Sequence, residues 1–345
     1  MSEEFLWLGF YLKERNLNKV IKYFEERISI KELIKEKKYS LKELENLAEQ
    51  EFKKAEKFEV KIFFRESEDY PEILKPLPYA PVFLYVKGTF NLEKPVIAII
   101  GSRKPTNYGK EVAYKFSKSL AEKGIGIISG LARGIDSIAH RACLEADGYT
   151  IAVLGSGIDV IYPAENKDLY EKIIKNNGAI ISEFPFGTKP RKENFPMRNR
   201  IISGLSHGVL VVEAGKRSGT LITAKWALNQ GKEVLAVPGN VFSSQSEGTH
   251  YLLKQGAVLV SSPEDIIEYL DLEIDQTEKD SEKEIIEVSQ EEKEILGLLS
   301  SYPQHIEEIF AKLNKPAFEI LSILTDLELK GLIETLPGKY VKLKN

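Results

Sequence analysis

Between residue 95 and residue 240, short apolar runs alternate with segments of helical pattern, and this alternation constrains the fold more than any other feature. The apolar runs are nearly continuous and rich in Val and Ile, which is typical of strands covered on both faces in a parallel sheet. Helical patterns fit between them. The alternation predicts an α/β fold with a Rossmann-like, doubly wound, mostly parallel sheet. The predicted strands are residues 96–100, 125–128, 150–154, 179–182, 209–212 and 233–237, and the helices between them include 108–123, 135–146, 166–176 and 220–230.

The segments on either side of this region have different patterns. Residues 1–60 predict short amphipathic helices, which form an N-terminal helical domain of the SAM or helix-hairpin-helix kind. Residues 61–270 form the Rossmann-like domain, and residues 271–288 are predicted to be an acidic linker. Residues 289–345 predict three helices followed by a hairpin, which indicates a C-terminal winged helix.

The distribution of charge matters more than the net charge of −4. Residues 271–300 contain eleven Asp and Glu against three Lys, so the rest of the chain is positive. Residues 190–225 contain seven Lys and Arg against two Glu. A basic segment of this kind suits a polyanionic partner.

Several classes of protein are disfavoured by composition. No run approaches the roughly 20 apolar residues that span a bilayer, and the acidic start does not resemble a signal peptide. A single cysteine, Cys143, excludes an intramolecular disulfide, and four scattered histidines offer little for a metal site. We therefore expect a cytoplasmic protein with no membrane contact, no metal and no cofactor.

Glycine-rich loops follow several of the predicted strands. Small residues let backbone N–H groups approach an anion, and the following helix N-terminus favours negative charge. Loops of this kind at one sheet edge, with Arg103, Arg133 and Arg217 among them, predict an extended phosphate-binding surface. The alternative for each single loop is that glycine merely permits the tight turn. The loops are Gly101-Ser102-Arg103, Ser129-Gly130 to Gly134, Gly155-Ser156-Gly157 and Gly215 to Arg217-Ser218-Gly219-Thr220.

Two common nucleotide-binding motifs are missing from the sequence. No G-x-x-x-x-G-K-[S/T] occurs, which disfavours a P-loop NTPase. Gly155-Ser156-Gly157 follows a strand, but Val160 stands where the third glycine of a dinucleotide motif belongs. The phosphate-binding surface therefore points to another kind of ligand.

The most unusual stretch is residues 192–204. Lys192 precedes Phe195, and a helix predicted to begin at Pro196 carries Arg198, Asn199 and Arg200 in its first turn. Cations at a helix N-terminus oppose its dipole, which indicates an external anion between them. An aromatic face beside a phosphate clamp suits single-stranded nucleic acid. The alternative is that Phe195 fills the core and the arginines pair with Glu183 and Glu213.

With these motifs in order, the sequence resembles the DNA-processing protein A family, also called DprA or Smf. The resemblance spans about residues 70–263, and the helices and winged helix outside it fit the family's layout. The motifs that carry it are Gly101-Ser102-Arg103, Ser129-Gly130-x-Ala132-x-Gly134-Ile135-Asp136, Gly157-x-Asp159-x-x-Tyr162-Pro163, Ser182-Glu183-x-Pro185-x-Gly187, Phe195-Pro196-x-Arg198-Asn199-Arg200-Ile201-Ile202, Val212-Glu213-Ala214 and Ser218-Gly219-Thr220-Leu221-Ile222-Thr223-Ala224.

The resemblance implies a function without catalysis. Members of the family bind single-stranded DNA and help to load the RecA recombinase, notably in natural transformation. By resemblance, Arg103 and Lys192 would contact phosphates and Phe195 a base. The Gly101-Ser102, Ser129-Gly130 and Ser218-Gly219-Thr220 loops would supply backbone and hydroxyl donors. Dimerisation in the family implies a homodimer here, with His250 and Leu259 at the interface.

Two other functions remain as alternatives. The domain resembles, more distantly, nucleotide phosphoribohydrolases, but Thr223 stands where their glutamate belongs, and glycosidic cleavage needs an acid or base there. A duplex-reading regulator would use the winged helix, but that segment is not basic. We interpret Asp136 as a helix cap, Asp159 and Glu213 as groups that orient loop arginines, and Tyr162 as a loop lock.

Overall fold

The chain folds into two compact units, residues 1–275 and residues 276–345. The computed structural model describes residues 3–273, 288–300, 303–313 and 315–343. Residues 274–287 of the predicted acidic linker at 271–288 therefore lie outside the described residues.

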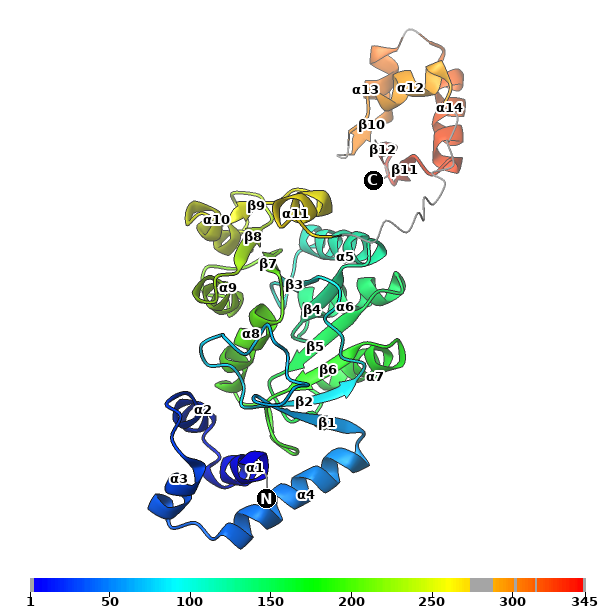
Figure 1. Ribbon diagram of the computed structural model, residues 1–345. Helices are drawn as coiled ribbons and strands as arrows, with labels where there is room; N and C mark the ends of the chain where they lie inside the picture. The colour runs from blue at the N-terminus through cyan, green and yellow to red at the C-terminus, as the bar shows by residue number, and fades with distance from the viewer. Residues whose placement is uncertain (1–2, 274–287, 301–302, 314, 344–345) are drawn as a thin grey trace. The chain divides into compact units, whose positions relative to one another are not determined.

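The first unit is built on one nine-stranded sheet (Figure 1). Seven neighbouring strands run parallel, and two N-terminal strands join them antiparallel at one edge. This confirms the predicted Rossmann-like, mostly parallel sheet. The strands, in their order across the sheet, are β1 (Val60–Phe64), β2 (Phe83–Gly88), β6 (Ala179–Ser182), β5 (Thr150–Leu154), β4 (Gly126–Ser129), β3 (Val96–Ile100), β7 (Gly208–Val211), β8 (Glu233–Ala236) and β9 (Val258–Leu259).

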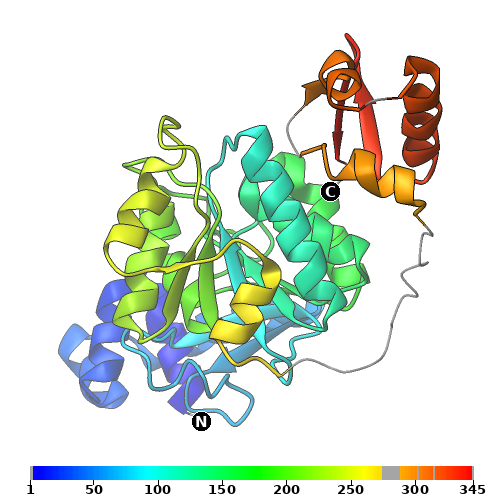
Figure 2. The same ribbon diagram turned by 90° about the horizontal axis from the view of Figure 1, so that it is seen from above.

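Helices cover both faces of the parallel sheet (Figures 1 and 2). Alternate residues of β3 show why, because Ile97 and Ile99 belong to one buried cluster and Val96 and Ala98 to another. The cluster around Ile97 includes residues of α5 (Asn107–Glu122), α6 (Ile135–Glu145) and α11 (Pro263–Tyr269), and α7 (Lys167–Lys175), preceded by the short η1 (Ala164–Asn166), packs beside α6. The cluster around Val96 includes residues of α8 (Asn194–Gly204), α9 (Thr220–Asn229) and α10 (Glu247–Lys254).

The N-terminal helices pack on the antiparallel edge of the sheet. Their apolar residues share one buried cluster with β1 and β2, in which Phe64 stacks on Phe83. Glu51 adds a polar contact, since its buried carboxylate accepts hydrogen bonds from the Phe186 backbone N–H at 2.8 Å and the Tyr85 hydroxyl at 3.2 Å. The helices are α1 (Glu3–Glu14), α2 (Leu17–Glu25), α3 (Ile30–Lys37) and α4 (Leu41–Lys57).

The strand order reverses beside β3. From β3 the chain winds outward through β4, β5 and β6, and then returns to the other side of β3 for β7, β8 and β9. Open parallel sheets bind ligands at the carboxyl ends of the strands, at such a reversal. We therefore expect a ligand-binding site at the loops that follow β3 and β7.

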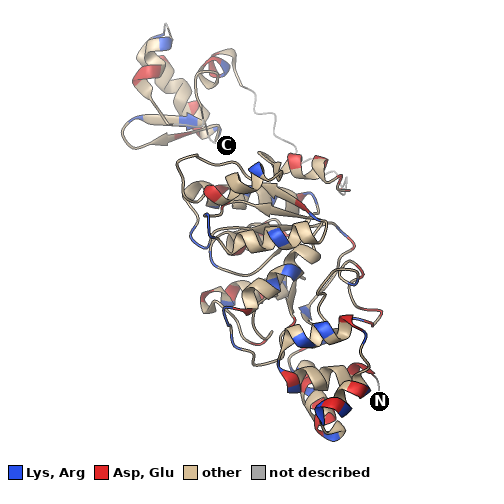
Figure 3. Cartoon of the chain, turned by 90° about the vertical axis from the view of Figure 1, so that its left-hand side faces the viewer, with Lys and Arg blue, Asp and Glu red and all other residues tan. Residues whose placement is uncertain are grey.

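The second unit is a small winged helix. Its helices are α12 (Gln290–Leu296), α13 (Ile306–Lys312) and α14 (Ala317–Leu329), with a three-stranded sheet in the order β10 (Gln304–His305), β12 (Tyr340–Leu343), β11 (Ile333–Leu336). The two-residue strand β10 pairs antiparallel with β12 and adds a third strand to the predicted hairpin. In Figure 3, acidic and basic residues are interspersed along the described elements of this unit and along the N-terminal helices.

Candidate functional site

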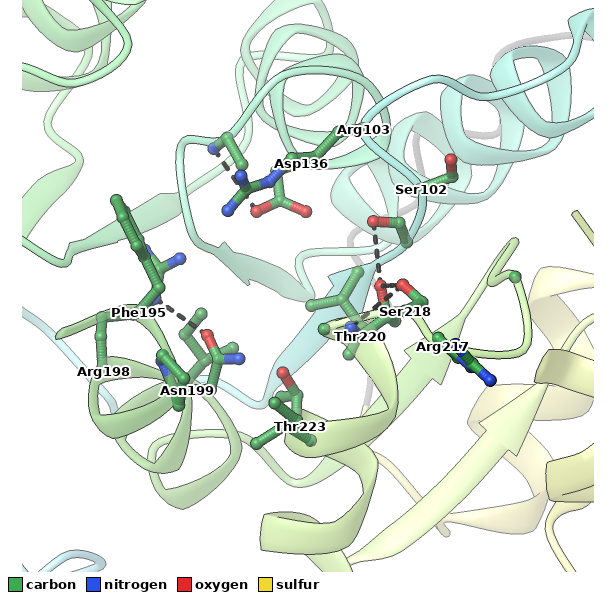
Figure 4. A pocket seen from close by; sticks show the side chains of 18 of the residues that line it. Ser102, Arg103, Asp136, Phe195, Arg198, Asn199, Arg217, Ser218, Thr220 and Thr223 are labelled. Atoms are coloured by element: carbon green, nitrogen blue, oxygen red, sulfur yellow. Dashed lines mark hydrogen bonds between the residues drawn. The ribbon is translucent and has the colours of Figure 1, made fainter. Parts of the chain in front are cut away.

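A pocket of about 730 Å³ opens at the carboxyl ends of the parallel strands. The loops after β3 and β7 and the first turns of α8 and α9 supply most of its wall, which places it at the reversal of strand order. Figure 4 shows the side chains converging from these elements. The pocket is lined by Ile100, Gly101, Ser102, Arg103, Ala132, Asp136, Tyr162, Lys192, Phe195, Pro196, Arg198, Asn199, Ile202, Gly215, Arg217, Ser218, Gly219, Thr220, Ile222, Thr223 and Gln245.

Phe195 forms an aromatic wall of the pocket. Helix α8 begins at Asn194, two residues earlier than predicted, so Phe195 lies in its first turn. The guanidinium of Arg103 lies 5.4 Å from the ring centroid, and Tyr162 packs against the ring at 5.6 Å. A Cβ at Gly155 would lie 2.8 Å from the ring, so glycine is needed there. The Phe195 ring is half-buried, so it does not fill the core as the alternative interpretation proposed.

Three exposed cations line the same pocket as this aromatic wall. Arg103, Lys192 and Arg217 all line the pocket and are solvent-exposed, although they come from three separate loops. Asp136 is the one carboxylate among the lining residues of the described chain. The pocket therefore attracts anions, and Phe195 provides a flat apolar surface beside them.

Arg198 supports the pocket from below. Its buried guanidinium donates to the carbonyl oxygen of Gly130 at 2.7 Å and to that of Val153. Burial lowers the pKa of Arg198 to about 10, although the nearby Asp136 carboxylate opposes this shift. The carbonyl oxygens of Gly130 and Val153, together with the nearby Asp136 carboxylate, thus compensate a cation for which we expected an external anion. A Cβ at Gly130 would lie 2.5 Å from this guanidinium, so Gly130 serves packing.

Asp136 orders the loop after β4. Its carboxylate accepts hydrogen bonds from the backbone N–H of Gly130 at 3.1 Å and of Ala132 at 3.4 Å. Burial raises its pKa, while Arg198 and Arg103 act in the opposite direction. Asp136 stands in the first turn of α6, but its side chain binds the preceding loop. The prediction that it caps this helix is therefore wrong.

The hydroxyls of Ser218 and Thr220 hold loops together. Ser218 donates to Thr220 Oγ1 at 2.9 Å, and Thr220 donates to the carbonyl oxygen of Gly101 at 3.1 Å. We expected these hydroxyls to serve as ligand donors, but their hydrogens are used internally. Gly219 instead is the N-cap residue of α9, with open space where a Cβ would point, which leaves room for an anion at the helix N-terminus.

Four predicted contact residues lie outside the main pocket. Ser129 is buried and donates to the Ile99 carbonyl, and Gly130 and Arg133 line a smaller adjoining cavity of about 50 Å³. Arg133 forms a two-pronged ion pair with Glu165 at 2.7 and 2.8 Å. Arg200 is fully buried and pairs with Glu183, as the alternative interpretation held.

The other predicted carboxylate roles differ in the structure. Glu213 accepts from the backbone N–H of Thr106 at 2.9 Å and from its hydroxyl, so it holds the loop after β3, and it pairs with no arginine in the part of the chain that the structure describes. Asp159 accepts from the backbone N–H of Gly187 at 2.8 Å. The motif spacing marked both residues but did not reveal their partners.

Sequence reasoning missed part of the lining. Tyr162 lines the pocket next to Phe195, and its motif was noticed but given a different role. Thr223 was noticed for the glutamate it replaces, and it faces the pocket from α9. Gln245 comes from the loop after β8, where only the topology would have drawn attention to it.

The remaining predictions concern other surfaces. Leu259 on β9 is 56% exposed, and His250 Nε2 lies 3.1 Å from the Gly239 carbonyl oxygen. Within the described ranges, no three or more His, Cys, Asp and Glu side chains gather where they could hold a metal ion. Among the same residues, no helix has the length and apolar character that crossing a membrane requires.

Comparison with known families assigns most of the chain. Residues 61–271 match the family described as DNA recombination-mediator protein A, and residues 279–339 match the DprA winged helix domain. The chain is 41% identical to Protein Smf of Escherichia coli over 285 residues, covering 81% of this chain and 76% of that protein. It is 47% identical to DNA processing protein DprA of Bacillus subtilis over 206 residues, 59% of this chain and 69% of the relative.

Two solved structures are also similar. DNA processing protein A from Streptococcus pneumoniae superposes with a TM-score of 0.62 at 34% identity, over 79% of this chain and 94% of that one. DNA processing protein A from Helicobacter pylori, studied for its single-stranded DNA binding mode, gives a TM-score of 0.57 at 32% identity, over 63% and 98% of the two chains.

Proposed function

Since the chain belongs to the DNA recombination-mediator protein A family, a family of mediators in DNA processing, we propose that its pocket binds single-stranded DNA. Arg103 and Lys192 contact phosphates, Phe195 stacks on a base, and Arg217 and the N-terminus of α9 receive a further phosphate. Asn199 lines the same wall and offers its amide to a base edge.

One observation carries this proposal. Arg103 comes from the loop after β3, whereas Lys192 and Phe195 come from the segment that leads into α8, and yet they meet in one pocket, with the Arg103 guanidinium 5.4 Å from the Phe195 ring centroid. A ring set among cations inside a pocket is reached by an unpaired base, whereas the bases of a duplex are already stacked and paired. The arrangement therefore favours single strands over double strands.

Competition binding tests this preference. The full-length chain is titrated with a labelled single-stranded oligonucleotide in the presence of unlabelled single-stranded or duplex competitor, at several salt concentrations. We expect the single strand to compete far better, with an affinity that falls as salt rises. Equal competition by both would contradict the proposal.

We also propose that the protein acts with two protein partners. It helps to load the RecA recombinase onto the bound strand, and it forms a homodimer in which His250 and the exposed Leu259 contact the second copy. Sedimentation of Leu259→Lys beside the parent chain tests the dimer, since a charge in an apolar interface should yield monomers. RecA assembly on coated single strands, with and without the protein, tests loading. We propose a cytoplasmic location, since the proposed partners act on DNA.

The proposed activity involves no catalytic step. Thr223 occupies the position of the phosphoribohydrolase glutamate and lines the pocket with a hydroxyl, which is a poor acid or base at neutral pH. Incubation with nucleoside monophosphates should release no free base. Release of base that disappears in Thr223→Ala would restore the hydrolase alternative.

We assign the domains as the sequence divides them. Residues 1–60 form a helical domain that supports the sheet edge, residues 61–270 carry the DNA pocket, and residues 289–345 form a winged helix with a separate role. Helix α14 contains no Lys or Arg between Ala317 and Leu329, which makes a groove-reading role unfavourable.

A further inference from the structure

The loop between β8 and α10, residues 237–246, presents an aromatic ring to solvent. Phe242 is 95% exposed and its neighbour Val241 is 75% exposed. Asn240 holds the turn in shape, since its side-chain oxygen accepts from the Phe242 backbone N–H at 2.8 Å and its carbonyl accepts from the Ser243 N–H at 3.0 Å. A ring kept in water by an ordered turn is typical of a contact surface.

This loop is joined to the pocket. The Ala214 N–H donates to the Gln245 carbonyl at 2.8 Å, and Gln245 itself lines the pocket. The loop leaves the carboxyl end of β8, which lies parallel to β7 and next to it. Phe242 therefore stands at the same edge of the sheet as the pocket, on the neighbouring loop.

Exposed cations lie on the intervening loop. Lys216 and Arg217 follow β7, and in the order β3-β7-β8 their loop falls between that of Arg103 and that of Phe242. Gly215 of the same loop approaches the β8 loop, because a Cβ there would lie 3.5 Å from the Ser244 carbonyl oxygen. A path of cations that ends on an aromatic ring suits a continuing nucleic-acid strand.

We propose that Phe242 is a second base-stacking position for the strand that the pocket holds, with Lys216 and Arg217 neutralising the phosphates between; this rests on the proposed function. Phe195 packs over the loop after β5, and Phe242 follows β8, four strands away in the sheet. Four strand spacings amount to about 19 Å. At roughly 3.4 Å per stacked nucleotide, this corresponds to about six nucleotides.

A second copy of the chain is the competing occupant of this surface. Tyr251 on α10 is 55% exposed and follows the loop in the sequence, so an apolar interface could include both. An isologous interface through the loop would, however, bring Lys216 and Arg217 of two copies toward each other, which is electrostatically unfavourable. The charges therefore favour DNA.

Oligonucleotide length separates these occupants. The affinities of the full chain for oligothymidylates of about three and about twelve nucleotides are measured by fluorescence anisotropy, and their ratio reports the second position. Phe242→Leu should lower the ratio of long to short affinity by about 5- to 150-fold, the range expected for loss of one stacked base. Phe242→Trp should preserve it. Val241→Ala, a neighbouring apolar change without a ring, is the matched control and should leave it unaltered.

Each contrary outcome has a distinct meaning. An unaltered ratio in Phe242→Leu, with normal binding by the parent chain, would overturn the second stacking position alone. A lowered ratio that accompanies dissociation of a dimer in sedimentation would overturn it in favour of an interface between copies. Failure of the parent chain to bind either oligonucleotide would overturn the proposed function and this inference together.

Discussion

The Arg103→Ala substitution gives the sharpest test of the pocket. The side chain is exposed at the pocket mouth, so its loss should disturb the fold little, and it removes one phosphate contact and the cation over the Phe195 ring. Hydrogen bonds to charged groups contribute about 1.5–3 kcal/mol. Because Arg103 is exposed, we take the lower end, which corresponds to roughly a tenfold loss of affinity.

The salt dependence gives a second readout of the same substitution. One phosphate contact contributes about 0.7 to the slope of log affinity against log salt for single strands. Between 50 and 200 mM salt the parent chain should therefore lose about 2.6-fold more affinity than Arg103→Ala. Fluorescence anisotropy with oligonucleotides of several base sequences measures both effects, which should not depend on sequence.

Arg133→Ala is the matched control for this prediction. It removes the same side chain from a neighbouring loop, but Arg133 is already neutralised by its ion pair with Glu165. Its affinity and slope should remain close to those of the parent chain. The reasoning is refuted if Arg103→Ala keeps the parent slope, or if the two variants lose affinity equally.

Three further predictions concern stability and the division of the chain. Glu183→Gln leaves the Arg200 cation buried without its anion and should lower the free energy of unfolding by about 3–5 kcal/mol, whereas the double variant with Arg200→Met should lose less stability. Urea denaturation measures both free energies, and equal losses would contradict the buried-pair argument. Burial lowers the pKa of His140 to about 3, so below pH 6.5 the unfolded chain takes up a proton that the folded chain refuses, and stability should fall by about 1.4 kcal/mol per pH unit toward pH 3. Melting temperatures across that range should vary less in His140→Asn, and an identical profile would dismiss His140 as the cause. Removal of residues 276–345 should leave most single-strand affinity in the anisotropy assay, because every pocket residue precedes them; a collapse would favour duplex recognition by the winged helix.

The sheet could be predicted because each of its central strands is recognisable from its own residues. A strand buried on both faces must be apolar throughout, as in β3, whose residues 96–100 are all buried. The glycine-rich loops at the carboxyl ends then followed from topology, which placed Arg103 among them. The family resemblance, and not the topology, added Lys192 and Phe195 to the same pocket.

The partners of the two arginines on α8 could not be predicted in the same way. Arg198 and Arg200 stand two positions apart on α8, so they point in different directions around the helix. Arg198 donates hydrogen bonds to the carbonyl oxygens of Gly130 and Val153 under the pocket, whereas Arg200 pairs with Glu183 in the interior. Which direction faces the ligand depends on how α8 packs against the sheet, and this information is spread over distant residues.

Hydroxyl partners were equally hidden from sequence reasoning. Ser218 and Thr220 have the residue types of an anion-binding loop, and only the approach of the Gly101 carbonyl to Thr220 reveals that their hydrogens are engaged. The same residue types can bind a ligand or tie two loops together. Distances decide between these roles.

The carboxylate of Glu51 has a consequence for attempts to dissect this protein. It reaches from α4 to the backbone of Phe186, and aromatic side chains of α1 share a core with β1 and β2. A fragment that began at β1 would expose this apolar surface to water, which favours aggregation. It would also leave the Phe186 backbone N–H without the Glu51 carboxylate as its hydrogen-bond acceptor. A truncation that leaves both parts folded should therefore be made near residue 275, where the two compact units meet in the sequence. The same position is where domains could be exchanged between proteins during evolution with the smallest loss of packing.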